Sequence, residues 1–327
     1  MEQRTQHFSR RNFIRTAGLA AGGALLPHAP APAEGRPASA DALLAGACDI
    51  HVHAAPDSRP RSVSELGFAR AAQKAGYRAV MYKSNDWSCH DRAFIVREAL
   101  PGFEVFGSII MNRLLGDRVN ALAARQALKT TGNLCRCIWM PTQDAAYQCA
   151  HERRGPGIPV LDASGGVLPE VVQVMEICAE ADIIFATGHS SPEESLVLAQ
   201  KAREVGVGKF VATHVNSLIW TMTPQQMERV AALGGYVELC CLPCFWGPDT
   251  PLPWPPQPVA RLAEFARVAP DRTFLSTDMG QAGLPDPLTA MRSAAASLLD
   301  CGLPREQLDY MIKTLPARLL GLRGDGQ

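Results

Sequence analysis

Two histidines separated by one residue end a short β-branched segment, Asp-Ile-His-Val-His over residues 49–53. On a β-strand, alternate side chains point to the same face, so His51 and His53 project together while Val52 points away. Imidazole nitrogens are ligands of divalent metals, and two parallel imidazoles supply half of a four-ligand site. Histidine pairs also occur without a metal. The pair therefore indicates metal chemistry only where further ligands converge on it.

Four more polar residues stand at the ends of later apolar segments. Lys83 follows Val-Met-Tyr, His189 follows Ala-Thr-Gly, His214 follows Val-Ala-Thr and Asp278 follows Leu-Ser-Thr. If these segments are parallel strands of one barrel, all of these residues lie on the rim where barrel enzymes place their chemistry. Nitrogen and oxygen donors rarely gather on one rim without a metal. Together the residues predict a metal site at that rim.

The elements that must position these residues are short apolar segments alternating with helical patterns. Eight strands are expected over 48–53, 79–84, 104–111, 134–141, 182–189, 210–214, 236–241 and 273–278. Helices are expected over 63–75, 90–100, 120–129, 168–181, 192–205, 224–233, 258–268 and 286–302. The strand segments are nearly continuous in apolar residues, as expected for strands buried on both faces. Eight such units predict an α/β fold, a single (β/α)8 TIM barrel. A doubly wound sheet is the alternative, but the turn after the first strand has no glycine for a phosphate.

The first 40 residues do not belong to the barrel, which we expect to span residues 41–327. Arg10 and Arg11 precede Asn-Phe-Ile, and an apolar stretch over 17–26 follows. That stretch is shorter than the about 20 apolar residues that cross a bilayer. The pattern resembles a twin-arginine signal peptide, which implies transport by the twin-arginine export machinery to the periplasm. A disordered basic N-terminus is the alternative.

The composition limits the partners. Lysine plus arginine equals aspartate plus glutamate, 32 each, and no basic run follows the leader. Nucleic acids and anionic membranes are therefore poor candidates, and no later segment predicts a stable membrane anchor. The expected partner is a small-molecule substrate, and a homo-oligomer is left open. Most of the ten cysteines lie in apolar segments, where cysteine acts as a small buried hydrophobe, and their disulfide status is left open.

Side chains near the strand ends suggest how a substrate is held. Arginine suits carboxylate or phosphate groups, which favours an acidic substrate. The loop over 243–258 contains seven prolines and two tryptophans, and it predicts either an aromatic wall over the pocket or a rigid surface excursion. The candidate substrate-binding residues are Arg59, Asn112, Arg113, Asn216 and Trp246.

The order His-x-His, His, His, Asp on strands one, five, six and eight resembles the amidohydrolase superfamily of metal-dependent hydrolases. The ending Leu-Pro-Ala-Arg-Leu-Leu-Gly over 315–321 resembles the superfamily's Asn-Pro-Ala-x-Leu-Leu-Gly, with leucine in place of asparagine. The resemblance covers the chain from Cys48 onward and is closest to an uncharacterised amidohydrolase-like branch with a lysine after strand two. It implies that His51, His53, His189 and Asp278 bind one or two divalent ions. Zinc is the expected metal, and manganese is the alternative.

The resemblance also implies roles for single residues. His214 would be a ligand of a second metal, or the group that orients the attacking water. Asp278 would take the proton of that water and return it to the leaving group. Strand four ends Trp-Met-Pro-Thr, without the usual bridging ligand, so Lys83 is the substitute, either as a carboxylated metal ligand or as an unmodified ammonium beside a single metal.

The sequence therefore predicts an enzyme, a metal-dependent hydrolase. It would use metal-activated water to cleave an amide, lactone or other ester of a small, acidic substrate. A metal-dependent decarboxylase or lyase on the same scaffold is one alternative. A non-catalytic periplasmic metal-binding or ligand-binding barrel is the other.

Overall fold

The computed structural model describes residues 42–323. The twin-arginine leader predicted for residues 1–40 lies outside this range. Among the described residues, no helix combines the length and the apolar character needed to cross a membrane.

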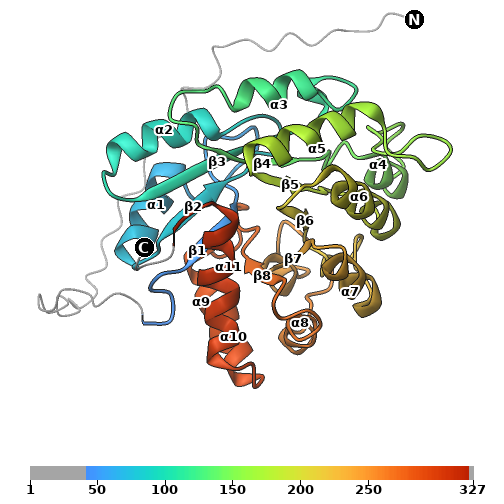
Figure 1. The fold of residues 1–327 in the computed structure, drawn as a ribbon. Helices are drawn as coiled ribbons and strands as arrows, with labels where there is room; N and C mark the ends of the chain where they lie inside the picture. Colours follow the sequence, from blue (N-terminus) through green and yellow to red (C-terminus); the bar gives the residue numbers. More distant parts are fainter. Residues whose placement is uncertain (1–41, 324–327) are drawn as a thin grey trace, which may run out of the picture. The chain divides into compact units, whose positions relative to one another are not determined.

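Eight parallel strands form the centre of the fold in the order of the sequence (Figure 1). They are β1 (Cys48–Val52), β2 (Ala79–Tyr82), β3 (Glu104–Ile110), β4 (Cys135–Trp139), β5 (Ile184–Ala186), β6 (Phe210–Ala212), β7 (Tyr236–Cys240) and β8 (Thr273–Ser276). The barrel closes where the Asp278 N–H donates to the His51 carbonyl at 2.8 Å and the His53 N–H to the Met279 carbonyl at 2.8 Å. The predicted (β/α)8 TIM barrel is confirmed.

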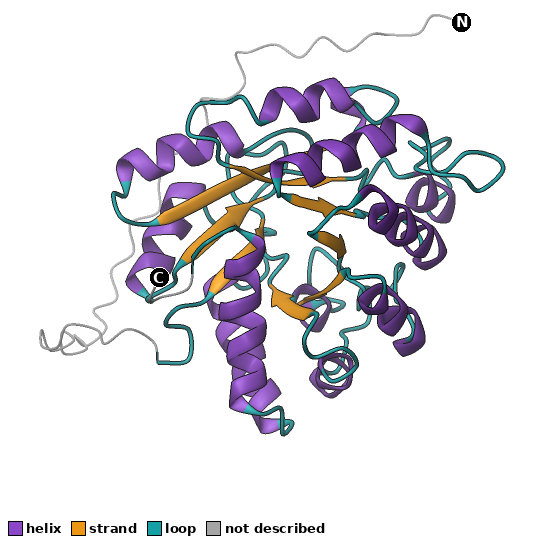
Figure 2. Ribbon diagram, in the orientation of Figure 1, coloured by secondary structure: helices purple, strands orange, loops and turns teal. Residues whose placement is uncertain are grey.

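Helices surround the strands (Figure 2). They are α1 (Glu65–Lys74), α2 (His90–Ala99), α3 (Ala121–Ala127), α4 (Ala146–His151), α5 (Pro169–Ala181), α6 (Pro192–Val205), α7 (Pro224–Ala232), α8 (Val259–Ala266), α9 (Pro287–Asp300), α10 (Arg305–Asp309) and α11 (Leu315–Leu319). Ser191 and Thr223 begin α6 and α7 with capping boxes. The sequence did not predict α4, α10, α11 or the π-helical turn Tyr310–Thr314, which contacts β1 and β8.

The strands are buried almost throughout, because helices cover their outer face and side chains fill the barrel. Cys135, Cys137, Cys240 and Cys241 lie in this core as free thiols, and Cys48 is buried with them. All eight strands end before their predicted limits, and the two that contain only three residues are β5, which ends at Ala186, and β6, which ends at Ala212. His189 and His214 therefore lie in the turns that leave these strands, at the same end of the barrel.

Candidate metal centre

The two β1 histidines converge on the aspartate that follows β8. Asp278 Oδ1 lies 3.0 Å from His51 Nε2 and 3.1 Å from His53 Nε2. Asp278 has φ +54°, and this left-handed turn leads the chain out of the ladder directly after β8. All three side chains are buried, and their donor atoms lie within 4.8 Å of one another.

A glutamate that sequence reasoning missed holds His51 from the other side. Glu238, on β7, accepts from His51 Nδ1 at 2.9 Å and from Ser276 Oγ at 2.7 Å. Its second oxygen accepts from the backbone N–H of His214 at 3.0 Å. Nδ1 of His51 is therefore the nitrogen that donates to Glu238, and Nε2 is the nitrogen that faces Asp278. The available signal was a carboxylate in the middle of an otherwise apolar strand, Tyr-Val-Glu-Leu-Cys.

His214 has no hydrogen-bond partner for either ring nitrogen among the described residues, although both are buried. Burial lowers its pKa to about 4, so the imidazole is neutral and offers a lone pair. Its ring centroid lies 5.9 Å from that of His51 and 4.8 Å from that of His189. A buried imidazole whose nitrogens have no hydrogen-bond partner, next to two further histidines, is the arrangement expected of a metal ligand.

His189 is oriented by a neighbouring amide. Its Nδ1 contacts Gln148 Oε1, while the Gln148 amide nitrogen donates to Glu152 at 2.7 Å. The amide oxygen is an acceptor, so Nδ1 is the protonated nitrogen and Nε2 is free. Burial holds the pKa of His189 well below its ordinary value. Gln148, on α4, is a second positioning residue that the sequence did not reveal.

Lys83 lies beside the histidine pair. Its Nζ is 3.1 Å from His51 Nε2 and 4.7 Å from the centroid of the Trp139 ring. The side chain is buried, and burial lowers the pKa of the amine. A lower pKa favours the neutral amine, which is the form compatible with a nearby cation.

These donors fit a divalent metal. Imidazole nitrogens and a carboxylate are common ligands of such ions, and the orphaned His214 extends the set formed by His51, His53 and Asp278. Glu238 and Cys240 make a second group with His51. That group is less suited, because the Glu238 oxygens already accept hydrogen bonds and burial keeps the Cys240 thiol protonated by raising its pKa.

A cavity of about 430 Å³ opens above these residues. His53, Lys83, His189, His214 and Asp278 line it, together with the predicted substrate residues Arg59 and Trp246. This volume is within the usual range for small-molecule sites.

Three predicted substrate residues do not line this cavity. Asn112 Oδ1 accepts from the Thr142 N–H at 2.7 Å, and Asn216 exchanges two hydrogen bonds of 2.9 Å with the backbone of Cys240. Arg113 donates to Asp117 at 2.7 Å. The two asparagines connect neighbouring turns at the end of the barrel that carries the site, and the arginine lies on the surface.

A glycine allows β1 and the turn after β8 to approach closely. Gly280 has φ +126°, and an added Cβ would overlap the carbonyl oxygen of His53. We expect Gly280→Ala to lower the free energy of unfolding by about 1–3 kcal/mol and to reduce metal binding. Gly102→Ala is the matched control, because Gly102 also has a positive φ but nothing within 4 Å of an added Cβ. Equal losses for both variants in chemical denaturation would contradict the importance of this close approach.

Several solved structures resemble the barrel. A probable dipeptidase from Pseudomonas aeruginosa has a TM-score of 0.57 at 13% identity and covers 84% of this chain and 94% of its own. An amidohydrolase from Pseudomonas aeruginosa has a TM-score of 0.56 at 12% identity, and the alignment covers 85% of this chain and 97% of the amidohydrolase chain. The organophosphorus hydrolase from Deinococcus radiodurans has a TM-score of 0.54 at 16% identity, and the alignment covers 86% of this chain and 94% of the hydrolase chain. At these identities the similarity shows the (β/α)8 barrel fold alone.

A search of curated protein sequences gives no match. A family model does match, over residues 46–238, from the strand of the histidine pair to Glu238. The matched region includes five of the residues that surround the candidate metal centre: His51, His53, Lys83, His189 and His214. The chain belongs to this family, the family of unknown function DUF6282.

Proposed function

We propose that this protein is a hydrolase that depends on a divalent metal and cleaves an amide, lactone or other ester of a small molecule. The observation that carries the proposal is the convergence of His51, His53 and Asp278 beside a cavity that His53 and Asp278 line, with His214, whose ring nitrogens have no partner among the described residues, next to them. The hydrolase names of the structural neighbours support the same class. The twin-arginine pattern of the leader supports a periplasmic location.

The residues divide the chemistry among themselves. A bound divalent metal would supply a nucleophile at neutral pH and polarise the oxygen of the scissile group. Asp278 is the base that holds the proton of the attacking water and returns it to the leaving group. His214 orients the nucleophile, and Lys83 either donates a hydrogen bond to negative charge that develops at the site or bridges a second ion after carboxylation. Glu238 and Gln148 position His51 and His189.

Elemental analysis of the purified protein tests the metal requirement. We expect about one equivalent of zinc or manganese per chain if Lys83 is unmodified, and about two if a carboxylated Lys83 bridges two ions. His53→Ala should lose most of the metal. His151→Ala is the control, because this histidine ends α4 on the surface. Absence of metal, even after dialysis against zinc or manganese, would contradict the proposal.

The reaction class is tested with a panel of amides, lactones and esters in ¹⁸O-labelled water. Hydrolysis places the label in the acid product, whereas a decarboxylase or lyase reaction does not. A metal-loaded protein that converts no member of the panel would favour a non-catalytic binding barrel.

A further inference from the structure

We propose that Arg61 forms an acid-binding subsite in the cavity, and that the substrate carries a carboxylate beside its scissile bond and an apolar or aromatic body. This inference rests on the proposed function for the reaction, but its binding claim is tested without turnover. N-acyl amino acids and carboxylated lactones are substrate classes with this arrangement.

Arg61 is a buried cation with donors to spare. Its side chain is only 2% exposed, yet the residue lines the cavity. Every hydrogen bond that it makes to described residues uses Nη2, which donates to Asp57 Oδ2 at 3.1 Å and lies 3.3 Å from His53 Nδ1. Its Nε is buried and has no partner among residues 42–323. A planar guanidinium with unused donors suits a carboxylate, which can accept two parallel hydrogen bonds.

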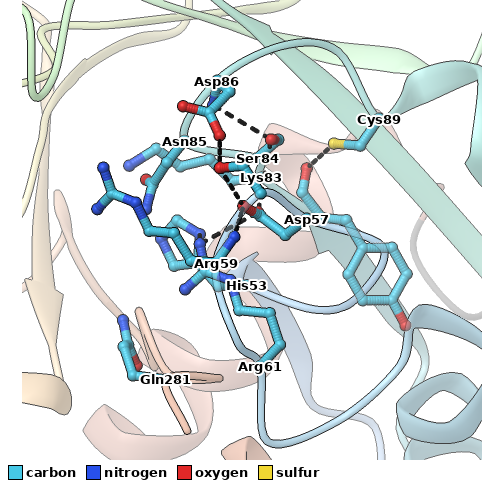
Figure 3. A network of polar contacts seen from close by, with 12 residues as sticks. His53, Asp57, Arg59, Arg61, Lys83, Ser84, Asn85, Asp86, Cys89 and Gln281 are labelled. Carbon is cyan, nitrogen blue, oxygen red and sulfur yellow. Dashed lines mark hydrogen bonds and ion pairs between the residues drawn. The ribbon is translucent and has the colours of Figure 1, made fainter. Parts of the chain in front are cut away.

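The loop around Arg61 is fixed rather than loose. The side chain of Asp57 is fully buried between Arg61 and Ser84, whose Oγ lies 3.5 Å away (Figure 3). The Ser62 N–H donates to the Gly280 carbonyl at 2.8 Å, and Arg61 pairs with Gln281 in an isolated bridge. These contacts hold the guanidinium in place before a ligand arrives, which lowers the entropy cost of binding.

The position of Arg61 determines which substrates it can serve. One imidazole ring, that of His53, separates it from the reacting residues, since Nδ1 faces Arg61 and Nε2 faces Asp278. A carboxylate at Arg61 therefore lies next to the scissile bond rather than at the far end of the substrate. Arg59, from the same loop, also lines the cavity and contacts Gln143 at the exposed mouth.

Another part of the lining is aromatic. Trp246 is buried and meets Trp254 edge to face, with 5.0 Å between ring centroids. Trp220 packs on His189 and on His214, with 4.0 Å and 4.8 Å between the ring centroids. These rings, with Leu242 and Leu252, offer an apolar surface to the body of the substrate.

The test compares two ligands of similar shape, benzoate and the neutral acetophenone, by calorimetric titration of the protein as purified. Wild type should bind benzoate more tightly than acetophenone. Arg61→Met should lower the affinity for benzoate by roughly 10- to 100-fold and leave the affinity for acetophenone within about twofold of the wild-type value. Arg61→Lys should recover part of the loss, because it keeps the charge but not the planar group. Arg118→Met is the control, since this exposed arginine pairs with Glu170 and does not line the cavity.

Arg61→Met leaves the charge of the buried Asp57 without its arginine partner, which could impair folding. The double variant Asp57→Asn/Arg61→Met removes that charge, and thermal melts of both variants show whether they are folded. Unchanged benzoate affinity in both variants would overturn the subsite even if the metal and hydrolysis are confirmed. Selective loss of benzoate binding in a protein without metal or turnover would support the subsite and contradict the proposed function.

Discussion

Asp278→Asn is expected to slow turnover by on the order of 10²–10⁴-fold, the usual contribution of a positioned acid–base group. Burial alone would raise the pKa of Asp278, but His51 and His53 hold it well below its ordinary value. The carboxylate is therefore ionised at neutral pH and able to accept a proton. Asparagine has nearly the same size and still accepts a hydrogen bond from an imidazole, but it cannot take up the proton.

The measurement is kcat of the variant at matched metal content, with the metal restored by dialysis where asparagine weakens its binding. Asp300→Asn serves as the control, because Asp300 is the exposed last residue of α9. Its kcat should stay within about twofold of wild type, as usual for a surface substitution. A metal-loaded Asp278→Asn with wild-type kcat would exclude Asp278 as the proton acceptor.

The sequence was sufficient to predict the barrel, because its evidence is local. Each strand is a short apolar segment, and proline or glycine marks the ends of most helices, as at Ser191-Pro192 and Gly206 of α6. The parallel topology then places all the strand ends on one rim, so His51, His53 and Asp278 could be grouped without coordinates. The ends of β5 and β6 were harder to predict, because Gly188 and His214 turn the chain out of the ladder with positive φ.

The supporting residues could not be predicted in the same way. Gln148 lies on α4, a short helix in a segment for which no helix was predicted, and its contact with His189 spans 41 positions of the chain. The burial of Arg61 depends on the approach of its loop to Gly280, a contact between distant parts of the chain, and on the pairing of its guanidinium with Asp57. Asn112 and Asn216 show the reverse error. Polar residues after strands can serve the backbone of a neighbouring turn instead of a substrate.

Glu238 shows why such residues matter for the site. It joins three elements, since one carboxylate accepts from His51 on β1, Ser276 on β8 and the backbone of His214 after β6. Burial alone would raise the pKa of Glu238, but His51 and these hydrogen bonds lower it. A buried carboxylate that remains ionised thus fixes both the orientation of the His51 ring and the course of the turn that carries His214.

Removal of this carboxylate is expected to cost both stability and metal affinity. Glu238→Ala leaves the Nδ1 proton of His51 and the His214 N–H without an acceptor inside the barrel. Loss of one partner from such a buried charged network typically costs about 3–5 kcal/mol in the free energy of unfolding. Glu238→Gln keeps the volume and one acceptor, so it should fold but bind the metal roughly 10- to 100-fold more weakly, as found for residues that orient metal ligands.

Chemical denaturation of the metal-free protein measures the first effect, and competition with a chelator measures the second. Glu264→Gln, on the exposed face of α8, is the matched control and should change neither quantity. A positioning role predicts that saturating metal restores most of kcat in Glu238→Gln, because Asp278 and the cavity are intact. If kcat stays low at full metal occupancy while stability is unchanged, Glu238 acts in the chemical step itself, and the assignment of the proton to Asp278 alone is wrong.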